Sequence, residues 1–493
     1  MKMLEPSPRK FPNRKRPVRD PVPRFKAEET NQLDFVRGCF EAQVPKDHLA
    51  RQVVDLIDKL DVSSTEAKYS SLGRRGYHPR HVLGVLVYGS LVGLHESTKL
   101  AKALKTDAAL RLAAGGHAIS EGRLRAFRRE NEQLMVLANR QILKLAAERG
   151  MLDGAHLATD SVRLRAHAST KSVRTLKRSK ERLDQLAAVD TTTLDAAGQQ
   201  RHEEKVEKHR QAVSHCERTG QTNFVTTNPS AGLLKFPTGA AAPGHRVTMT
   251  AAGVRERLIV DVLIDADSHD FGKLEGSMRR TRELFQSIGV SVDNMQVAAD
   301  AGYWSEKDLA FAAETKWVDV LIAERQTTYR GNDELHPLFP PHAFTLRDDG
   351  KAVCPAGTQM EGPFRDGRAE RFHGVGCTSC PLKSKCTKGK RKYLTIDAKN
   401  LHLRAAMNQR MNQPGAKQRY NERIATIEPV FSSIQHAMGF RRLSARHEKS
   451  IRAEVLLKVV AHNASRLLAA ARKSLCVRVW ISWISDQRGA DVA

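Results

Sequence analysis

The sequence predicts an α/β protein with a helical N-terminal region. Three observations lead to this fold class. Residues 31–150 place apolar side chains at helical spacing, residues 245–264 alternate as a β-hairpin does, and residues 270–323 alternate helices with short strands. The chain has 493 residues, of which 40% are hydrophobic. It is therefore long enough for a sizeable core and about three structural units.

The charge of the chain indicates the kind of partner it meets. Lys and Arg number 81 and Asp and Glu 55, which gives a net charge of +26 and a pI near 10.0. Such an excess indicates a polyanion, either nucleic acid or an acidic membrane surface. No apolar run is long enough to span a membrane, and the basic N-terminus lacks the apolar segment of a secretory signal. Seven cysteines in so long a chain fit a reduced, cytosolic setting better than a disulfide scaffold.

The N-terminal third is predicted to be helical after a basic arm. Residues 1–30 are rich in Lys, Arg and Pro, and we expect a flexible arm that is either a solvated tail or a phosphate contact. In residues 31–150, Ser120 can cap a helix over residues 121–149. Four arginines crowd its first turns and oppose its dipole, so either DNA phosphate or solvent must compensate them. They are Arg123, Arg125, Arg128 and Arg129.

The catalytic half, residues 151–475, is predicted to alternate strands and helices around two insertions. Residues 169–218 read as a helical hairpin and residues 325–418 as a Cys-rich insertion, while residues 476–493 form a tail. Without the insertions the order is three strands, then helix, strand, helix, strand, helix. Three antiparallel strands followed by crossover helices are a ribonuclease-H-like order. The strands are expected at 157–166, 245–252, 256–264, 296–299 and 318–323, and the helices at 270–288, from Ser305, at 420–438 and at 447–473.

Three acids fall at positions where a site would form. Asp160 lies within the first strand, Asp300 ends the fourth strand, and Glu428 lies on the helix after the Cys-rich stretch. Ligands of open α/β sheets gather at the carboxyl ends of strands, and three carboxylates can hold the two Mg²⁺ ions of phosphodiester chemistry. The chain has 55 acids, however, so placement alone does not select these three. A competing cluster is assigned mostly to turns and caps: Asp261, Asp265, Asp267 and Asp270.

The residues around these acids resemble a known family. LATDSVRLRAHAST, VAADAGYWSEKDL and YNERIATIEPVFSSIQHAMGFRRL are similar to the three catalytic blocks of DDE transposases from bacterial insertion sequences. SLGRRGYHPRHVLGVLVYGSLVGLHESTKLAKAL, through to LRAFRRE, resembles their N-terminal helical domain. The resemblance implies a ribonuclease-H-like core that binds terminal inverted repeats, uses Mg²⁺, which Mn²⁺ can replace, and carries its metals on Asp160, Asp300 and Glu428.

The third block also resembles the family's signature of Tyr, Arg, Glu and Lys on one helix. Tyr420, Arg423 and Glu428 fit it, and Arg423 would hold a DNA phosphate. The family's Lys falls on Gln435, which keeps hydrogen bonding but loses the charge. Nearby cations that could compensate are His436, Arg441 and Arg442. Taken alone, Arg423 could equally form a surface ion pair with Glu422 or Glu428.

Four cysteines within residues 354–386 suggest a structural metal. Their pattern is C-x22-C-x2-C-x5-C, formed by Cys354, Cys377, Cys380 and Cys386. A C-x2-C knuckle suits tetrahedral Zn²⁺, and the surrounding stretch has too little apolar periodicity to fold alone. The alternative is four reduced thiols in a small satellite core, with His373 as a substitute ligand in the first case.

These observations favour a cytoplasmic, nucleoid-associated transposase that meets no membrane. Its partners would be double-stranded DNA, both transposon ends and target, and a second copy of the chain, because two ends must be joined. The helical domain would dock on DNA through the four arginines of residues 121–149. Two alternatives remain: a catalytically decayed DNA-binding copy, which Gln435 favours, and a simple nuclease of the same fold.

Overall fold

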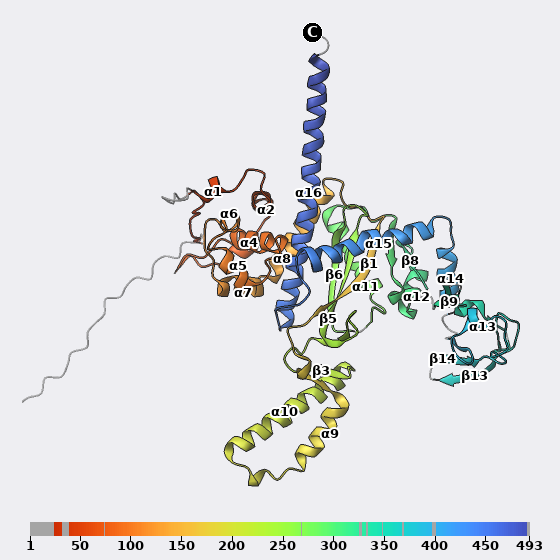
Figure 1. Ribbon diagram of the computed structural model, residues 1–493. Coiled ribbons are helices and arrows are strands. Elements are labelled where there is room, and N and C mark those ends of the chain that lie inside the picture. The colour runs from red at the N-terminus through yellow and green to blue at the C-terminus, as the bar shows by residue number, and fades with distance from the viewer. Residues whose placement is uncertain are drawn as a thin grey trace, which may run out of the picture.

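The computed structural model describes residues 24–31, 39–72, 74–267, 269–324, 328–331, 334–347, 349–366, 369–396 and 401–490 (Figure 1). Most of the predicted basic arm, residues 1–23, lies outside them. The described chain is of mixed α/β class, as expected, with a central mixed sheet and many helices. Within it, no helix combines the length and apolar character that a membrane span requires.

The central sheet has six strands and joins an antiparallel half to a parallel half at β1. β1 pairs antiparallel with β5 on one side and parallel with β7 on the other. β5 also pairs antiparallel with β4 and β6, and β7 pairs parallel with β8. The sequence predicted five of these strands and missed β4. The bounds are β1 (Leu157–Arg165), β4 (Gly232–Lys235), β5 (Ala241–Ala252), β6 (Leu258–Asp265), β7 (Met295–Ala299) and β8 (Val318–Ile322).

Helices cover both faces of this sheet. On one face, apolar residues of α15 (Ala416–Ser432) and α16 (Glu448–Ala490) pack on β1, β5 and β6. On the other face lie α11 (Leu274–Ile288) and α12 (Glu306–Glu314). The predicted stops and starts are confirmed here. α11 ends at Gly289, whose φ of +78° suits a residue without Cβ, and Ser305 caps α12 by accepting the N–H of Asp308.

The N-terminal helices pack around α4, which is buried at every residue from Val82 to Ser90. The predicted helix over 121–149 is instead two helices, because Asn131 leaves helical geometry at φ −125° and ψ 42°. Ser120 stands at the N-cap as predicted, yet its side chain makes no capping hydrogen bond. The helices are α1 (Phe40–Gln43), α2 (Leu49–Asp58), α3 (Ser63–Glu66), α4 (Pro79–Leu91), α5 (Ser97–Ala103), α6 (Ala108–Ala113), α7 (Glu121–Glu130) and α8 (Glu132–Ala147).

Helix α16 joins the N-terminal helices to the sheet. It contacts α4, α7 and α8 as well as β6, and it runs on to Ala490, where the sequence predicted a tail from 476. A polar group, named here the junction cluster, stabilises this contact and comprises the buried residues Ser90, Arg128, Glu454 and Lys458 together with the exposed Ser444. Lys458 Nζ donates to Ser90 Oγ at 2.8 Å, and Glu454 accepts from Ser444 Oγ at 2.8 Å.

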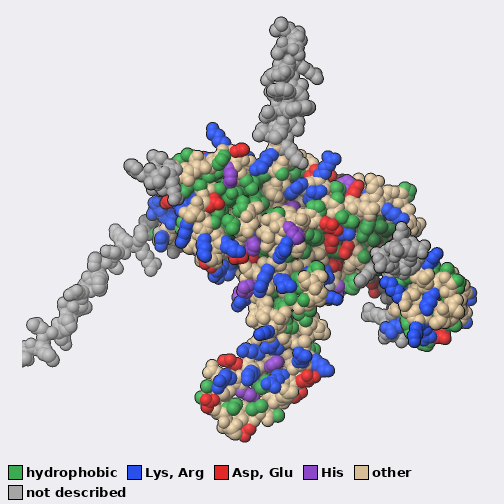
Figure 2. Space-filling view, viewed as in Figure 1, with side chains coloured by type: hydrophobic (Ala, Val, Ile, Leu, Met, Phe, Trp, Pro, Cys, Tyr) green, Lys and Arg blue, Asp and Glu red, His purple; other side chains and the backbone are tan. Residues whose placement is uncertain are grey.

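Two lobes project from the body in Figures 1 and 2. The first is the predicted helical hairpin, α9 (Leu176–Ala187) and α10 (Ala196–Thr219), whose base is closed by β2 (Val173–Thr175) and β3 (Asn223–Val225). On the face shown in Figure 2, Lys and Arg side chains gather over the N-terminal helices and where this hairpin joins the body.

The second lobe holds the cysteines and small sheets around a core of its own. The chain rejoins the body earlier than the predicted boundary at 418. α14 (Leu401–Met411) packs on β8, and Met407 Sδ accepts the N–H of Ile322. The other elements are β9 (Thr328–Gly331), β10 (Glu334–Pro337), β11 (Thr345–Leu346), β12 (Ala352–Val353), β13 (Glu361–Asp366), β14 (Ala369–His373), α13 (Lys383–Cys386) and β15 (Tyr393–Ile396).

Candidate active site

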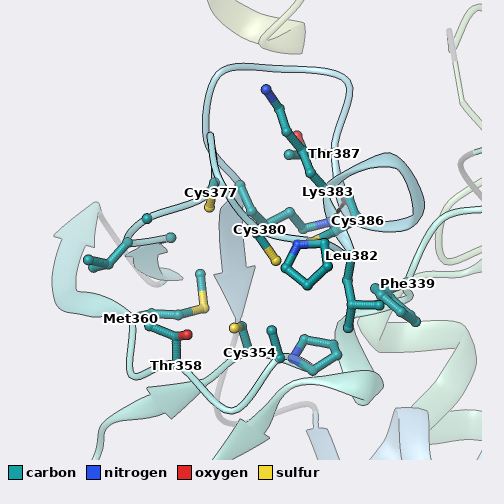
Figure 3. A pocket seen from close by; sticks show the side chains of 17 residues that line it. Phe339, Cys354, Thr358, Met360, Cys377, Cys380, Leu382, Lys383, Cys386 and Thr387 are labelled. Atoms are coloured by element: carbon teal, nitrogen blue, oxygen red, sulfur yellow. Dashed lines mark hydrogen bonds between the residues drawn. The ribbon is translucent and has the colours of Figure 1, made fainter.

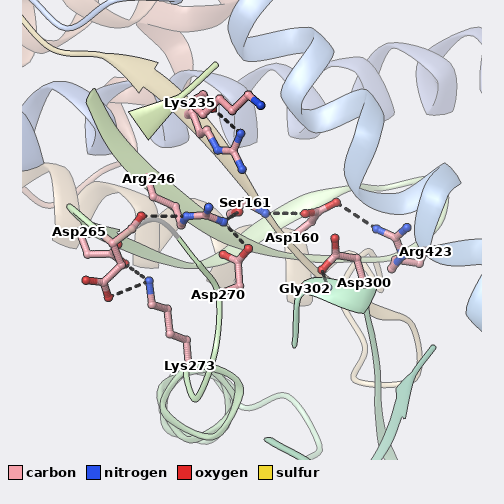
Figure 4. A network of polar contacts seen from close by, with 12 residues as sticks. Asp160, Ser161, Lys235, Arg246, Asp265, Asp270, Lys273, Asp300, Gly302 and Arg423 are labelled. Carbon is pink, nitrogen blue, oxygen red and sulfur yellow. Dashed lines mark hydrogen bonds and ion pairs between the residues drawn. The ribbon is translucent and has the colours of Figure 1, made fainter. Parts of the chain in front are cut away.

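Asp160 and Asp300 lie on neighbouring parallel strands at the point where the strand pairing ends. The last pair between β1 and β7 is Thr159 with Ala299, so the next residue of each strand is an aspartate. β7 stops there, and the Asp300 carboxylate accepts the N–H of Gly302 at 2.9 Å to begin a short 3-10 helix. The two acids therefore meet at the carboxyl end of β7, as the sequence predicted (Figure 4).

The Asp160 carboxylate is held from both sides. Oδ1 accepts the N–H of Ser161 at 2.7 Å, and Oδ2 accepts Nη1 of Arg423 at 3.0 Å. The exposed fractions of these side chains are 21% for Asp160 and 11% for Arg423. Arg423 thus pairs with Asp160, and the alternative of a surface pair with Glu422 or Glu428 is wrong; Glu422 pairs with His156 instead.

The carboxyl groups of Asp160 and Asp300 are both harder to ionise than that of an ordinary aspartate, chiefly because of burial. Burial, followed by the charge of Asp300, raises the pKa of Asp160 to about 6. Burial also raises the pKa of Asp300; the hydrogen bond from Gly302 opposes this shift, and the charge of Asp270 adds to it. Both carboxylates would therefore gain from a nearby cation.

Asp270 is a third acid beside these two partly buried ones, and the sequence interpretation missed it. It is 7% exposed, and its Oδ2 pairs with Nη1 of Arg246 on β5. Of the other members of the competing cluster, Asp261 lies within β6, so the turn assignment is wrong for it, and it pairs with Arg280. Asp265 and Asp267 lie where β6 ends and pair with Lys273. The available signal was Arg246, because an arginine inside a central strand requires a buried acid.

Tyr303 is a buried residue close enough to the three acids to be affected by their charges. The side chain is fully buried, and burial together with the charges of Asp270, Asp160 and Asp300, in that order, raises its pKa well above that of an ordinary tyrosine. The three carboxylates thus all act on the same buried phenol.

Helix α15 carries Tyr420, Arg423 and Glu428, which differ in their contacts and exposure. The guanidinium of Arg423 lies over the Tyr420 ring, 5.6 Å from its centroid, and the charges of Asp300 and Asp160 reach the Tyr420 hydroxyl. Glu428 is exposed five residues further on. Within the described chain the carboxylate of Glu428 forms no hydrogen bond or ion pair. Nor do any three Asp, Glu, His or Cys side chains of the described residues converge as metal ligands.

The helix is anchored beside Glu428 by the residue that follows it. Pro429 has no N–H, which leaves the carbonyl of Ala425, four residues earlier, without its helical partner. Arg257, from the turn between β5 and β6, donates to that carbonyl at 2.9 Å. The anchor fixes the turn of α15 that carries Glu428 against the sheet.

Two segments of the chain match models of known protein families. Residues 353–468 match the model of a transposase DDE domain, and residues 38–130 match that of a transposase domain of the N-terminal type (DUF772). The first segment includes α15 with Glu428, and the second includes the helices up to α7. Together the two matches support a DDE transposase of an insertion sequence. The searches of curated proteins and of solved structures gave no match.

Three of the four predicted DNA-contacting arginines of the transposase are exposed on α7, and one is not. Arg125 pairs with Glu121 and Arg129 with Glu130 at the surface, and Arg123 is exposed. Arg128 is buried, donates to Ser444 Oγ at 3.1 Å and lies 3.9 Å from Glu454. Its predicted role as a DNA contact is therefore wrong, because its guanidinium belongs to the junction cluster.

The residues proposed to replace the missing lysine gather at the end of α15. The carbonyl of Gln435 accepts Nε of Arg441 at 3.3 Å, and the ring of His436 contacts Nη2 of Arg441 at 2.7 Å. Arg442 is exposed and its backbone pairs with that of Arg165 at the end of β1. One cation, Arg441, thus lies close to Gln435.

The four cysteines of the transposase line one cavity of about 270 Å³ (Figure 3). Burial raises the pKa of Cys386, and the other three thiols add to the shift while Lys392 opposes it. Their sulfurs therefore lie near one another without meeting the geometry of a closed metal site. Cys354 and Cys386 also pack against the small apolar core of this lobe.

Proposed function

We propose that this transposase cuts DNA at the ends of its element and joins the freed ends to target DNA, using a ribonuclease-H-like core. The strand order supports this core: three antiparallel strands precede two parallel ones, with helices on both faces. The observation that carries the proposal is the meeting of Asp160 and Asp300 in a buried, electronegative region at the carboxyl end of β7.

The donor set fits a divalent cation. Carboxylate oxygens are the ligands that Mg²⁺ prefers, and Mn²⁺ accepts the same set. Asp160 and Asp300 would hold it, and Glu428, which has no partner in the described chain, would complete the site from α15. A bound pair of such ions activates water or a 3′-hydroxyl and neutralises charge on the phosphate.

Arg423 and Tyr420 would position the DNA strand at this point. In the DNA-free protein one arm of the Arg423 guanidinium is bonded to Asp160, while its buried Nε has no partner in the described chain. A guanidinium binds phosphate with two donors, so Arg423 can hold a backbone phosphate beside the carboxylates.

Double-stranded DNA would be bound mainly through exposed basic side chains. On α7 these are Arg123, Arg125 and Arg129, and near the end of β1 they are Arg441 and Arg442. Contacts of this kind neutralise phosphates, so binding should weaken steeply with salt. Because two element ends are joined, we propose a homodimer in the DNA complex.

The cysteine cavity is proposed to hold a structural Zn²⁺. Thiolates in a C-x2-C knuckle are typical zinc ligands, and the mutual repulsion that they exert on Cys386 would be relieved by the ion. Metal analysis of the purified chain should find about one Zn per chain. A clean preparation without zinc would contradict this site.

Asp300→Asn tests the proposed function. The variant should lose Mg²⁺-dependent nicking of DNA from the element's ends and keep its binding to that DNA, because the amide cannot replace a charged ligand. Asp293→Asn, an exposed aspartate before β7, is the matched control and should nick normally. Nicking by Asp300→Asn would contradict the assignment.

The wild-type chain decides between the alternatives in the same assay. End binding without nicking would select the decayed copy that Gln435 favours. Nicking without joining of labelled ends to a plasmid would select a simple nuclease.

A further inference from the structure

We propose that Asp270 is a further carboxylate of the metal site, acting beside Asp300; this inference rests on the proposed function. Asp270 lies between β6 and α11 and is 93% buried. Figure 4 shows its carboxylate facing Asp300, with Arg246 behind it. Neither matched family segment includes this residue.

One carboxylate oxygen of Asp270 has no partner in the described chain. Oδ2 of Asp270 is bonded to Arg246, but Oδ1 is buried and has no hydrogen-bond donor in the described chain. Leaving a buried carboxylate oxygen unsatisfied is costly, and such a group persists where a ligand satisfies it. Asp261 provides the contrast, since both its oxygens are bonded to Arg280 at 2.8 Å.

The carboxylate of Asp270 lies close to that of Asp300. A Cβ built on Gly302 would lie 2.9 Å from Oδ1 of Asp300 and 3.2 Å from Oδ2 of Asp270. Both carboxylates therefore border the same small space, which glycine keeps free of a side chain. Two acids packed so closely repel each other unless a cation lies between them.

Arg246 explains how Asp270 is held in place without a metal. Its guanidinium also donates to Ser161 Oγ at 2.7 Å, next to Asp160 on β1, and to the carbonyl of Asp267 at 3.1 Å. Oδ2 of Asp270 is thus fixed by the protein where it borders the shared space, while Oδ1 has no donor in the described chain. Such an arrangement pre-positions a ligand before the cation binds.

Mn²⁺ binding to the full-length chain without DNA, measured by calorimetry, tests the inference. Asp270→Asn should weaken Mn²⁺ binding by about 10-fold or more. Asp267→Asn, three residues earlier and paired with Lys273, should bind as the wild type does. Wild-type affinity in Asp270→Asn, with binding lost in Asp160→Asn, would contradict this inference alone. A wild-type chain that binds no Mn²⁺ would contradict the proposed function as well.

Arg246→Gln separates a ligand from a residue that only orients Arg246. If Asp270 binds the cation, removing the competing positive charge should leave Mn²⁺ affinity unchanged or raise it. If Asp270 acts only through Arg246, affinity should fall as far as in Asp270→Asn, and the inference would be wrong.

A measurement on the wild-type chain covers the case in which these variants do not fold. Fe²⁺ bound in place of Mg²⁺, with ascorbate and peroxide, cleaves the backbone close to the ion. We expect cuts near 160 and 300 and also near 270. Cuts near 160 and 300 without one near 270 would overturn the inference.

Discussion

The carboxylate region, formed by Asp160, Asp270 and Asp300, and the junction cluster both contain several charges shielded from solvent. They differ in how far those charges are paired. Glu454, in the junction cluster, is 1% exposed, and its oxygens accept from Ser444 and Ala445 while Arg128 lies beside it. At the end of β7, the carboxylate of Asp160 is paired with the guanidinium group of Arg423, and that of Asp270 with the guanidinium group of Arg246. Oδ1 of Asp270 has no donor in the described chain.

This difference distinguishes charges that stabilise the fold from charges that serve the function. A buried ion network that satisfies each of its members holds two parts of a fold together. A buried network that leaves negative charge unsatisfied is costly to fold, and it is explained by a cation that binds there. Substitutions in the carboxylate region should therefore impair metal binding and leave stability unchanged or higher. Substitutions in the junction cluster should lower stability and leave metal binding unchanged.

The largest effect is expected from Asp160→Asn. Nicking should fall by at least about 100-fold, because metal stabilisation of the transition state is worth several kcal/mol. The melting temperature should stay the same or rise, since the repulsion from Asp300 is removed. Nicking assays and calorimetry on the same preparation measure both. A marked loss of stability would place Asp160 among the structural charges and so weaken the comparison.

Glu454→Gln should lower the stability of the protein and leave its metal binding unchanged. It leaves Arg128 and Lys458 buried without their carboxylate, and breaking such a group costs roughly 3 kcal/mol of unfolding free energy. Mn²⁺ affinity should not change, because the junction cluster lies outside the carboxylate region. Denaturant unfolding measures the loss, with the exposed Glu448→Gln as the control. Equal stability of the two variants would refute the role of the cluster.

Lys458 gives the junction cluster a pH dependence. Burial lowers the pKa of Lys458 from 10.5 to about 7, although Glu454 opposes the shift. Between these pH values the unfolded chain binds a proton that the folded chain does not, so stability should rise with pH across this window. The rise should exceed about 1 kcal/mol in the wild type relative to Lys458→Met. Parallel curves for the two proteins from pH 7 to 10 would show that Lys458 stays charged.

The smallest effect is expected from Gly302→Ala. The added Cβ would press on Asp300 and Asp270, which can move only by giving up their shared space. Mn²⁺ affinity should fall by up to about 10-fold while the fold persists. Unchanged affinity in calorimetry would mean that the two carboxylates do not close on a common ion.

The sequence predicted what local pattern and strand order determine. Apolar periodicity located five strands of the sheet, Gly289 and Ser305 marked helix ends, and order brought Asp160 and Asp300 to neighbouring strands. Short β4 carries too little pattern to be recognised.

What the sequence did not show depends on distant partners. Arg128 looks like its exposed neighbours, and only Glu454, far along the chain, makes it a buried residue. Asp270 looks like one of several turn acids until Arg246 on β5 is seen behind it. In both cases an arginine and an acid distant in sequence fix each other's place.

The most direct test of the metal site is a crystal structure with Mn²⁺, using its anomalous signal. The account predicts a peak within about 2.2 Å of carboxylate oxygens from both Asp160 and Asp300. A peak bound to other side chains, or none beside these two at saturating Mn²⁺, would contradict it.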